Sequence, residues 1–192
     1  MNDAIKIVKT EIVSQKWSTL KVVTLEFLQK DGSWQQQTRE AYDRGNGAAI
    51  LLYNVQQQSV ILTRQFRLPA YINGDLTGML TEVCAGKLDS DSPEVCIKRE
   101  TEEETGYQIS EVRKVMEAYM SPGSVTEILY FFVGEYAADM KINDGGGVAN
   151  EHENIEVLEM DFKDALSKID SGEIRDAKTI MLLQYARLKH LL

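Results

Sequence analysis

The segment 80–106 constrains this chain more than any other part of its sequence. The segment Leu80–Ala85 is a strand candidate, and a helix is expected shortly after it. Ser92 is a natural N-cap for that helix, and Pro93 suits its first position. Gly106 is a natural C-terminal stop. Any fold of this chain must therefore place a strand and a short, well-capped helix next to each other.

The predicted helix carries an unusual group of carboxylates. Glu100, Glu103 and Glu104 leave one face of a helix within about one turn. Like charges at this spacing repel, so a cation is expected nearby, and clustered carboxylate oxygens suit Mg²⁺. The alternative is a solvated acidic face, which is the commoner role of three glutamates taken alone.

The rest of the chain predicts an α+β fold of two parts. Residues 1–43 read as an N-terminal antiparallel β subdomain, with a hairpin turn at Asp31-Gly32, and residues 44–192 as the main domain. The predicted strands are Leu20–Leu28, Trp34–Tyr42, Ala48–Tyr53, Val60–Leu62, Val112–Tyr119, Ile128–Val133 and Ile155–Met160, and the predicted later helices are Phe162–Ile169 and Ala177–Leu191.

Composition excludes several classes of partner. A net charge of −9 over 192 residues argues against nucleic acid, but a small phosphorylated substrate stays compatible because bound metal can reverse the local charge. The sequence has no apolar run of about 18 residues, so no membrane span is expected. Cys84 and Cys96 are expected to be reduced, buried thiols, which favours a cytoplasmic location together with an N-terminus that lacks a signal pattern.

The helix and the glycine before it resemble the signature of the Nudix hydrolase superfamily. Gly86 corresponds to the opening glycine, and Arg99–Tyr107 to the closing Arg-Glu-x-x-Glu-Glu-x-Gly half. The chain departs from the pattern in three ways. The interval between these parts is one residue shorter, Ser92 stands at the first glutamate position, and Thr101 and Tyr107 replace aliphatic residues. The resemblance implies an α/β/α sandwich with a mixed sheet between helices.

Further segments resemble one branch of that superfamily, which cleaves ADP-ribose and nucleotide sugars. They are Gln65–Arg67, Met120–Glu127 and Glu151–Val157, and three others resemble bacterial members that act on GDP-mannose: Tyr42–Gly47, Gly145–Val148 and Gly172–Asp176. The resemblance implies Mg²⁺-dependent hydrolysis of a nucleoside diphosphate sugar, with GDP-mannose giving GMP and mannose 1-phosphate. Alternatives are hydrolysis of ADP-ribose to AMP and ribose 5-phosphate, attack at the sugar carbon, and a non-catalytic nucleotide-sugar-binding module.

The resemblance also implies the metal ligands. Glu100 and Glu104 are expected to bind two or more Mg²⁺ ions, for which Mn²⁺ is an alternative, and the carbonyl of Ala85 is expected to complete one site. Glu103 is expected to be a direct or outer-shell ligand, and Arg99 to orient the carboxylates.

A second acidic pair follows three glycines. By the resemblance, Glu151 is expected to be the general base and Glu153 a metal ligand, although the two roles are interchangeable. The glycines suggest a segment that is free to close over a bound diphosphate. Glu103 and Glu104 complete the expected catalytic set.

The expected substrate contacts come from both parts of the chain. Arginine side chains suit phosphates, Glu127 suits sugar hydroxyls, and Trp17 is a candidate to stack on the base. The full expected set is Trp17, Thr38, Arg39, Glu40, Arg67, Ala85, Gly86, Lys87, Glu127 and Lys178. In the resembled enzymes the N-terminal unit packs across a two-fold axis, so we expect a homodimer whose active sites are shared between subunits.

Overall fold

The computed structural model describes residues 4–148 and 154–192, which form two compact units. Unit 1 consists of Met1–Asn46 and Tyr119–Ile128, and unit 2 of Gly47–Ala118 and Leu129–Leu192. The distant segment Tyr119–Ile128 is joined to unit 1 by backbone hydrogen bonds. Tyr42 N donates to Ser124 O at 2.8 Å, and Thr126 N donates to Tyr42 O at 3.1 Å.

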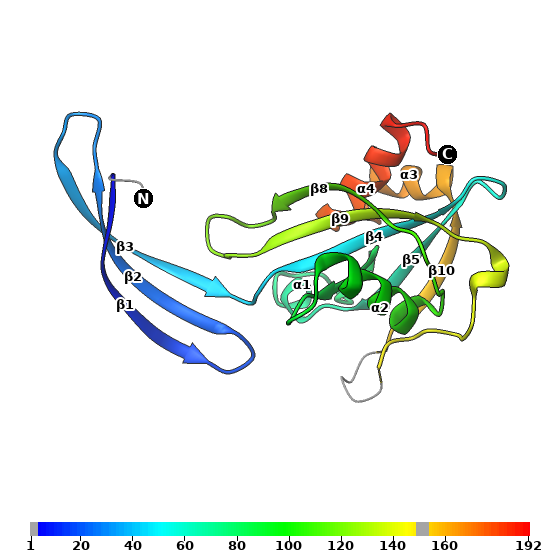
Figure 1. Cartoon of the computed structure of the whole chain (residues 1–192), viewed down its shortest axis with the longest axis horizontal. Helices are drawn as coiled ribbons and strands as arrows, with labels where there is room; N and C mark the ends of the chain where they lie inside the picture. The colour runs from blue at the N-terminus through cyan, green and yellow to red at the C-terminus, as the bar shows by residue number, and fades with distance from the viewer. Residues whose placement is uncertain (1–3, 149–153) are drawn as a thin grey trace. The chain divides into compact units, whose positions relative to one another are not determined.

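Unit 1 contains a three-stranded antiparallel sheet (Figure 1). The predicted hairpin is confirmed by β2 (Thr19–Leu28) and β3 (Trp34–Asp43), which are joined through a turn with Gly32 at a φ of +85°. A third strand, β1 (Ile5–Gln15), was not predicted and pairs with β2. No residue of the three strands is buried within a single chain.

Unit 2 is built on a mixed sheet in the order β10-β5-β4-β9-β8. Its central strand β4 is buried along nearly its whole length, as expected for a strand covered on both faces. The strands are β4 (Gly47–Asn54), β5 (Ser59–Phe66), β6 (Met79–Glu82), β7 (Cys84–Lys87), β8 (Arg113–Tyr119), β9 (Ile128–Glu135) and β10 (Glu156–Asp161).

Helices cover both faces of this sheet (Figure 1). On one face, Cys96 and Ile97 of the first long helix pack in a core cluster with Ile50 and Leu52 of β4. The other face is covered by the two C-terminal helices, so the predicted α/β/α arrangement with a mixed sheet is confirmed. The helices are α1 (Leu68–Ile72), α2 (Pro93–Thr105), α3 (Phe162–Asp170) and α4 (Ala177–Leu188), with a 3₁₀ turn at Ala138–Met140.

The single strand predicted over Leu80–Ala85 is wrong, because the chain forms two strands there. β4 and β5 pair only near their shared turn and then diverge, so β6 pairs with β5 while β7 pairs with β4. Val83 lies at the switch, and its N–H donates to the side chain of Thr179 in α4 at 2.8 Å. The switch places β7 directly beneath α2, the helix with the three glutamates.

Other predictions differ in detail. The C-terminal helix ends at Leu188 rather than Leu191, since His190 has a φ of +51°. α1 and the 3₁₀ turn were not predicted. Both cysteines, Cys84 and Cys96, are free and buried, as expected. Within the described ranges, no helix is long and apolar enough to cross a membrane.

Candidate active site

The acidic helix α2 begins and ends where its sequence predicts. Ser92 is the N-cap, and its hydroxyl accepts a hydrogen bond from Val95 N. Gly106 is the C-cap in the left-handed conformation, with a φ of +78°, and its N–H donates to Glu102 O. The positions of the carboxylates along the helix are therefore fixed by its own ends.

The departures from the Nudix signature have structural roles. Ser92 caps the helix instead of supplying a carboxylate. Thr101 is fully buried, and its hydroxyl donates to Ile97 O. Tyr107 is buried against Tyr136, with ring centroids 5.1 Å apart in an edge-to-face arrangement. These substitutions serve the core and the helix end, and they leave the three glutamates in place.

Two of the glutamates face strand β7. Glu104 is 2% exposed, and its Oε2 accepts a hydrogen bond from Ala85 N at 3.3 Å. The Glu100 carboxylate lies over Gly86, where an added Cβ would be 1.9 Å from the carboxyl carbon. Only glycine permits this approach, so Gly86 and Glu100 form one tightly packed contact.

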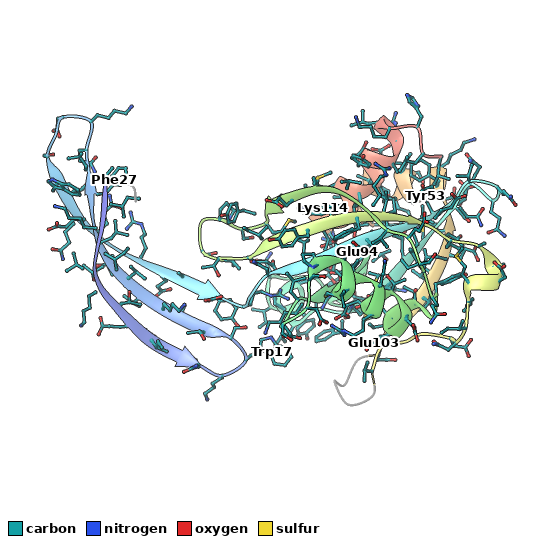
Figure 2. The ribbon with its side chains drawn as sticks, in the orientation of Figure 1. Trp17, Phe27, Tyr53, Glu94, Glu103 and Lys114 are labelled. Atoms are coloured by element: carbon teal, nitrogen blue, oxygen red, sulfur yellow. The ribbon has the colours of Figure 1, made fainter. Side chains whose placement is uncertain are left out.

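Arg99 organises the exposed side of the same group. Its guanidinium donates to Glu103 Oε2 at 2.7 Å, lies 2.9 Å from Glu100 Oε1 and reaches Asp91 at 3.5 Å. Burial alone would lower the pKa of Arg99, but the charges of Glu100 and Glu103 raise it above its ordinary value. Arg99 thus offsets repulsion between the two carboxylates, in keeping with the orienting role expected of it. Figure 2 shows Glu103 on α2.

The donors around β7 and α2 suit a hard divalent cation. Glu100, Glu103 and Glu104 supply carboxylate oxygens, and the space above Gly86 holds one of them against the strand. In the part of the chain that the structure describes, no three Asp, Glu, His or Cys side chains already form a metal-binding group. Instead, the guanidinium of Arg99 forms ion pairs with two of the carboxylates, those of Glu100 and Glu103. The donor chemistry fits Mg²⁺, and Arg99 would have to share its partners with the ion.

Two of the expected phosphate-binding cations meet beside this group. Arg67 and Lys178 both pair with the buried carboxylate of Glu82, at 2.5 Å and 3.3 Å. Burial opposes the charge on Arg67, but the hydrogen bonds and charge of Glu82, followed by the charges of Glu104 and Asp176, raise the pKa of Arg67. Glu104 and Asp176 thus help to stabilise the positive charge of Arg67. The importance of Glu82 was not predicted, because a single glutamate within a strand candidate gives no signal of its own.

The glycines after α2 are anchored to the end of that helix by backbone hydrogen bonds. Gly146 N donates to Glu104 O at 2.9 Å, and Gly147 N donates to Glu103 O at 3.0 Å. Gly145 has a φ of +67°, and an added Cβ would lie 2.5 Å from Glu104 O. The glycines therefore satisfy carbonyl groups at the end of α2. Glu151, His152 and Glu153 lie outside the described residues.

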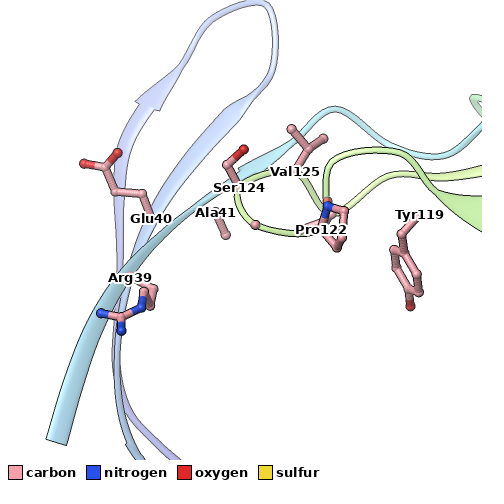
Figure 3. Close-up of a pocket in the computed structure, with 9 residues that line it drawn as sticks. Arg39, Glu40, Ala41, Tyr119, Pro122, Ser124 and Val125 are labelled. Atoms are coloured by element: carbon pink, nitrogen blue, oxygen red, sulfur yellow. The ribbon is translucent and has the colours of Figure 1, made fainter. Parts of the chain in front are cut away.

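Several expected substrate contacts lie in unit 1. A hollow of about 690 Å³ is lined by Arg39 and Glu40 of β3 and by the loop between β8 and β9 (Figure 3). Tyr119 and the loop residues Ser124 and Thr126 also line the hollow, although they were not predicted as site residues. Their signal in the sequence was only the Ser-Pro-Gly loop itself.

The remaining unit 1 residues are more dispersed. Trp17 is 89% exposed at the β1–β2 turn (Figure 2). The Thr38 hydroxyl lies 3.4 Å from that of Thr24, and the Glu127 carboxylate pairs with Arg44 at 3.5 Å.

Ala85, Gly86, Arg67, Lys178 and the three glutamates form one neighbourhood in unit 2, as their contacts above describe. Lys87 has an exposed side chain, and its Nζ lies 3.8 Å from Asp89. Among the described residues, unit 2 holds the expected metal ligands Ala85, Glu100, Glu103 and Glu104 and the expected phosphate ligands Arg67 and Lys178. The expected contacts in unit 1 are Trp17, Thr38, Arg39, Glu40 and Glu127.

Comparison with known families assigns both parts of the chain. Residues 4–42 match the family described as GDP-mannose pyrophosphatase NudK N-terminal domain, and residues 43–183 match the NUDIX domain.

Full-length relatives are also similar. A GDP-mannose pyrophosphatase of Shigella flexneri is 52% identical over 192 residues, which is all of this chain and all of the relative. A GDP-mannose pyrophosphatase of Yersinia pestis is 55% identical over 188 residues, covering 98% of this chain and 94% of the relative.

Among solved structures, one described as an ADP compounds hydrolase superimposes with a TM-score of 0.70. It covers 95% of this chain and 92% of its own, at 18% identity, and so supports the fold alone.

Proposed function

The chain belongs to the Nudix hydrolases, and from that premise we propose that it hydrolyses the pyrophosphate bond of GDP-mannose to GMP and mannose 1-phosphate. The observation that carries the proposal is the packing of Glu100 on Gly86 and of Glu104 on Ala85. This packing keeps a family-typical carboxylate group intact in a chain that matches GDP-mannose pyrophosphatases over their full length.

Glu100, Glu104 and the carbonyl of Ala85 hold Mg²⁺ in this proposal, with two or more ions in the site. When bound, Mg²⁺ offsets the charge of the diphosphate and lowers the pKa of a bound water. Arg99 holds the side chains of Glu103 and Glu100 in place in this proposal, since its guanidinium pairs with both carboxylates. Glu151 and Glu153 remain our candidates for the general base and a further metal ligand.

Arg67 and Lys178 bind the phosphates in this proposal. A guanidinium presents two parallel donors to phosphate oxygens, and an ammonium adds a compact charge. Both cations share Glu82, so they act on one diphosphate. Glu127 accepts hydrogen bonds from sugar hydroxyls.

Unit 1 supplies the nucleotide contacts as part of a homodimer. The support is its unburied sheet, which exposes apolar side chains on every strand: Ile5, Ile7, Val8, Ile12, Val13, Phe27 and Trp34. Apolar exposure of this extent is typical of an interaction surface, and a second copy of the chain would cover it. Trp17 then stacks on the base, and Thr38, Arg39 and Glu40 contact the substrate of the partner. The free thiols of Cys84 and Cys96 favour a reducing, cytoplasmic setting.

ADP-ribose is the second candidate substrate, because it presents the same diphosphate. A panel of nucleotide sugars with Mg²⁺ separates the two, with products identified by chromatography. We expect the highest kcat/KM for GDP-mannose, and GMP and mannose 1-phosphate as products. A large preference for ADP-ribose would reject GDP-mannose as the substrate.

Reaction in ¹⁸O-water tests the bond that is broken. Label in GMP or in mannose 1-phosphate indicates cleavage at phosphorus, as we propose. Label in free mannose indicates attack at the sugar carbon and would overturn the proposal.

A further inference from the structure

Glu82 is a buried carboxylate to which no step of the proposed reaction assigns a task. It lies at the end of β6 and is 3% exposed. Its carboxylate accepts hydrogen bonds from Arg67 Nε at 3.0 Å and from Arg67 Nη2 at 2.5 Å. Its other oxygen lies 3.3 Å from Lys178 Nζ. One buried charge thus holds two cations that come from distant parts of the chain.

The geometry at Arg67 leaves one edge of the guanidinium available. Glu82 takes the edge formed by Nε and Nη2. Nη1 has no hydrogen-bond partner among residues 4–148 and 154–192, and the side chain is 38% exposed. A guanidinium fixed along one edge presents the remaining donors in a set direction, as recognition of an anion requires.

Lys178 is fixed by the same carboxylate and by the start of its own helix. Its Nζ lies 2.9 Å from Asp176, the N-cap of α4, and its side chain is only 13% exposed. The neighbouring Thr179 accepts a hydrogen bond from Val83 N, one residue after Glu82. The start of α4 is therefore docked on the strand end that carries Glu82.

We propose that Glu82 is the positioning residue for the substrate diphosphate. It does not touch the substrate, but it holds Arg67 and Lys178 side by side at a separation set by its two oxygens. Without it, two cations in a poorly solvated place would repel each other and move apart. The inference rests on the proposed function, in which these two cations bind the phosphates.

The alternative role for Glu82 is competition with the phosphates for the same two cations, and it predicts the opposite change in KM. A carboxylate beside a phosphate site also competes for its cations. If Glu82 acts mainly as a competitor, Glu82→Gln removes one negative charge and lowers KM. If Glu82 positions the cations, the same variant raises KM about tenfold and changes kcat much less.

The experiment compares wild type, Glu82→Gln, Arg67→Gln and the double variant, with KM, kcat and the Kd of GDP-mannose by calorimetry. Positioning predicts that Glu82→Gln raises KM less in the Arg67→Gln background than in wild type, because only the part that acts through Lys178 remains. Additive effects of the two substitutions, or a lowered KM in Glu82→Gln, would overturn the proposal. Glu159→Gln is the control, because it also removes a carboxylate in the sheet that accepts a hydrogen bond, in this case from the Tyr136 hydroxyl at 2.7 Å.

A second variant and a binding measurement decide the role of Glu82 if the first comparison fails. Should Glu82→Gln fail to fold, Glu82→Asp retains the charge but shortens the reach, so positioning predicts a raised KM and competition predicts an unchanged one. If wild type binds GDP-mannose without hydrolysing it, the proposed reaction fails, and the Kd comparison still decides the role of Glu82.

Discussion

The Glu100 carboxylate lies so close to Gly86 that a Cβ at position 86 would be 1.9 Å from its carboxyl carbon. The contact joins the helix that carries the three glutamates to the strand that supplies Ala85. Because a hydrogen atom is the only side chain that fits, position and orientation of Glu100 depend on this glycine. The contact therefore connects the sequence signature to its geometry.

Gly86→Ala tests this contact. We expect kcat to fall about a hundredfold, because a displacement of about 1 Å at a reacting centre has effects of this size. We also expect a loss of about 1–3 kcal/mol in the free energy of unfolding, as for other overpacked sites. Steady-state kinetics and urea unfolding measure the two effects.

Gly134→Ala is the matched control for Gly86→Ala. Its Cβ would lie 3.3 Å from Ile50 and 3.4 Å from Leu52, inside the same sheet but against flexible apolar side chains. It is expected to reduce stability while kcat stays near wild type. If both variants lost kcat equally, the effect of Gly86→Ala would be explained by lost stability alone.

Arg99→Gln tests the orientation of the carboxylates. Without the guanidinium, Glu100 and Glu103 repel and lose their fixed positions, so we expect the Mg²⁺ concentration for half-maximal activity to rise about tenfold. Arg113→Gln is the control, because Arg113 lies outside α2 and its guanidinium donates to the Tyr185 hydroxyl at 3.0 Å. An unchanged Mg²⁺ requirement in Arg99→Gln would exclude the orienting role.

Mixing two inactive variants tests the shared active site. In a homodimer with shared sites, Arg39→Ala impairs the partner's site, whereas Glu104→Gln impairs its own. A heterodimer then contains one intact site, so refolding an equal mixture should recover about a quarter of wild-type activity. A mixture that stays inactive, although light scattering shows dimers, would contradict a site built from two subunits.

The pH dependence of unit 1 follows from Asp43. A hydrogen bond from Lys21 at 2.9 Å, followed by one from Gly45 N, lowers the pKa of Asp43 below its ordinary value of 3.8. A lowered pKa contributes stability above the ordinary value, and this contribution is lost as the pH falls through the folded pKa. Both side chains are partly exposed, so the contribution is less than about 1 kcal/mol.

Asp43→Asn should therefore be slightly less stable than wild type at pH 7, and the difference should vanish as the pH falls well below 3.8. Urea unfolding at both pH values measures it. A difference that persists unchanged in acid would show that the ion pair is not its cause.

The predictable parts of the fold are those with local signals. α2 was predicted at both ends because Ser92, Pro93 and Gly106 act within one turn of the helix. β4 was predicted because a strand buried on both faces has an unbroken apolar sequence.

The remaining features depend on contacts distant in sequence. The change of partner at Val83, which splits one strand candidate into β6 and β7, depends on how far β4 and β5 diverge. Glu82 gains its importance only from Arg67 and Lys178, and Lys178 is 96 residues away from it. The hydrogen bond from Gly146 N to Glu104 O could not be predicted from the sequence either, because three consecutive glycines are equally compatible with a flexible segment.

The role of the three glutamates is tested by the rate of GMP formation from GDP-mannose by Glu104→Gln in saturating Mg²⁺. The amide preserves the shape of the side chain and can still accept from Ala85 N, so the fold should be retained, as circular dichroism and urea unfolding would verify. We expect kcat to fall about a thousandfold or more, because a ligand charge for Mg²⁺ is lost. A folded Glu104→Gln variant with wild-type kcat would contradict a metal-dependent hydrolase built on these glutamates.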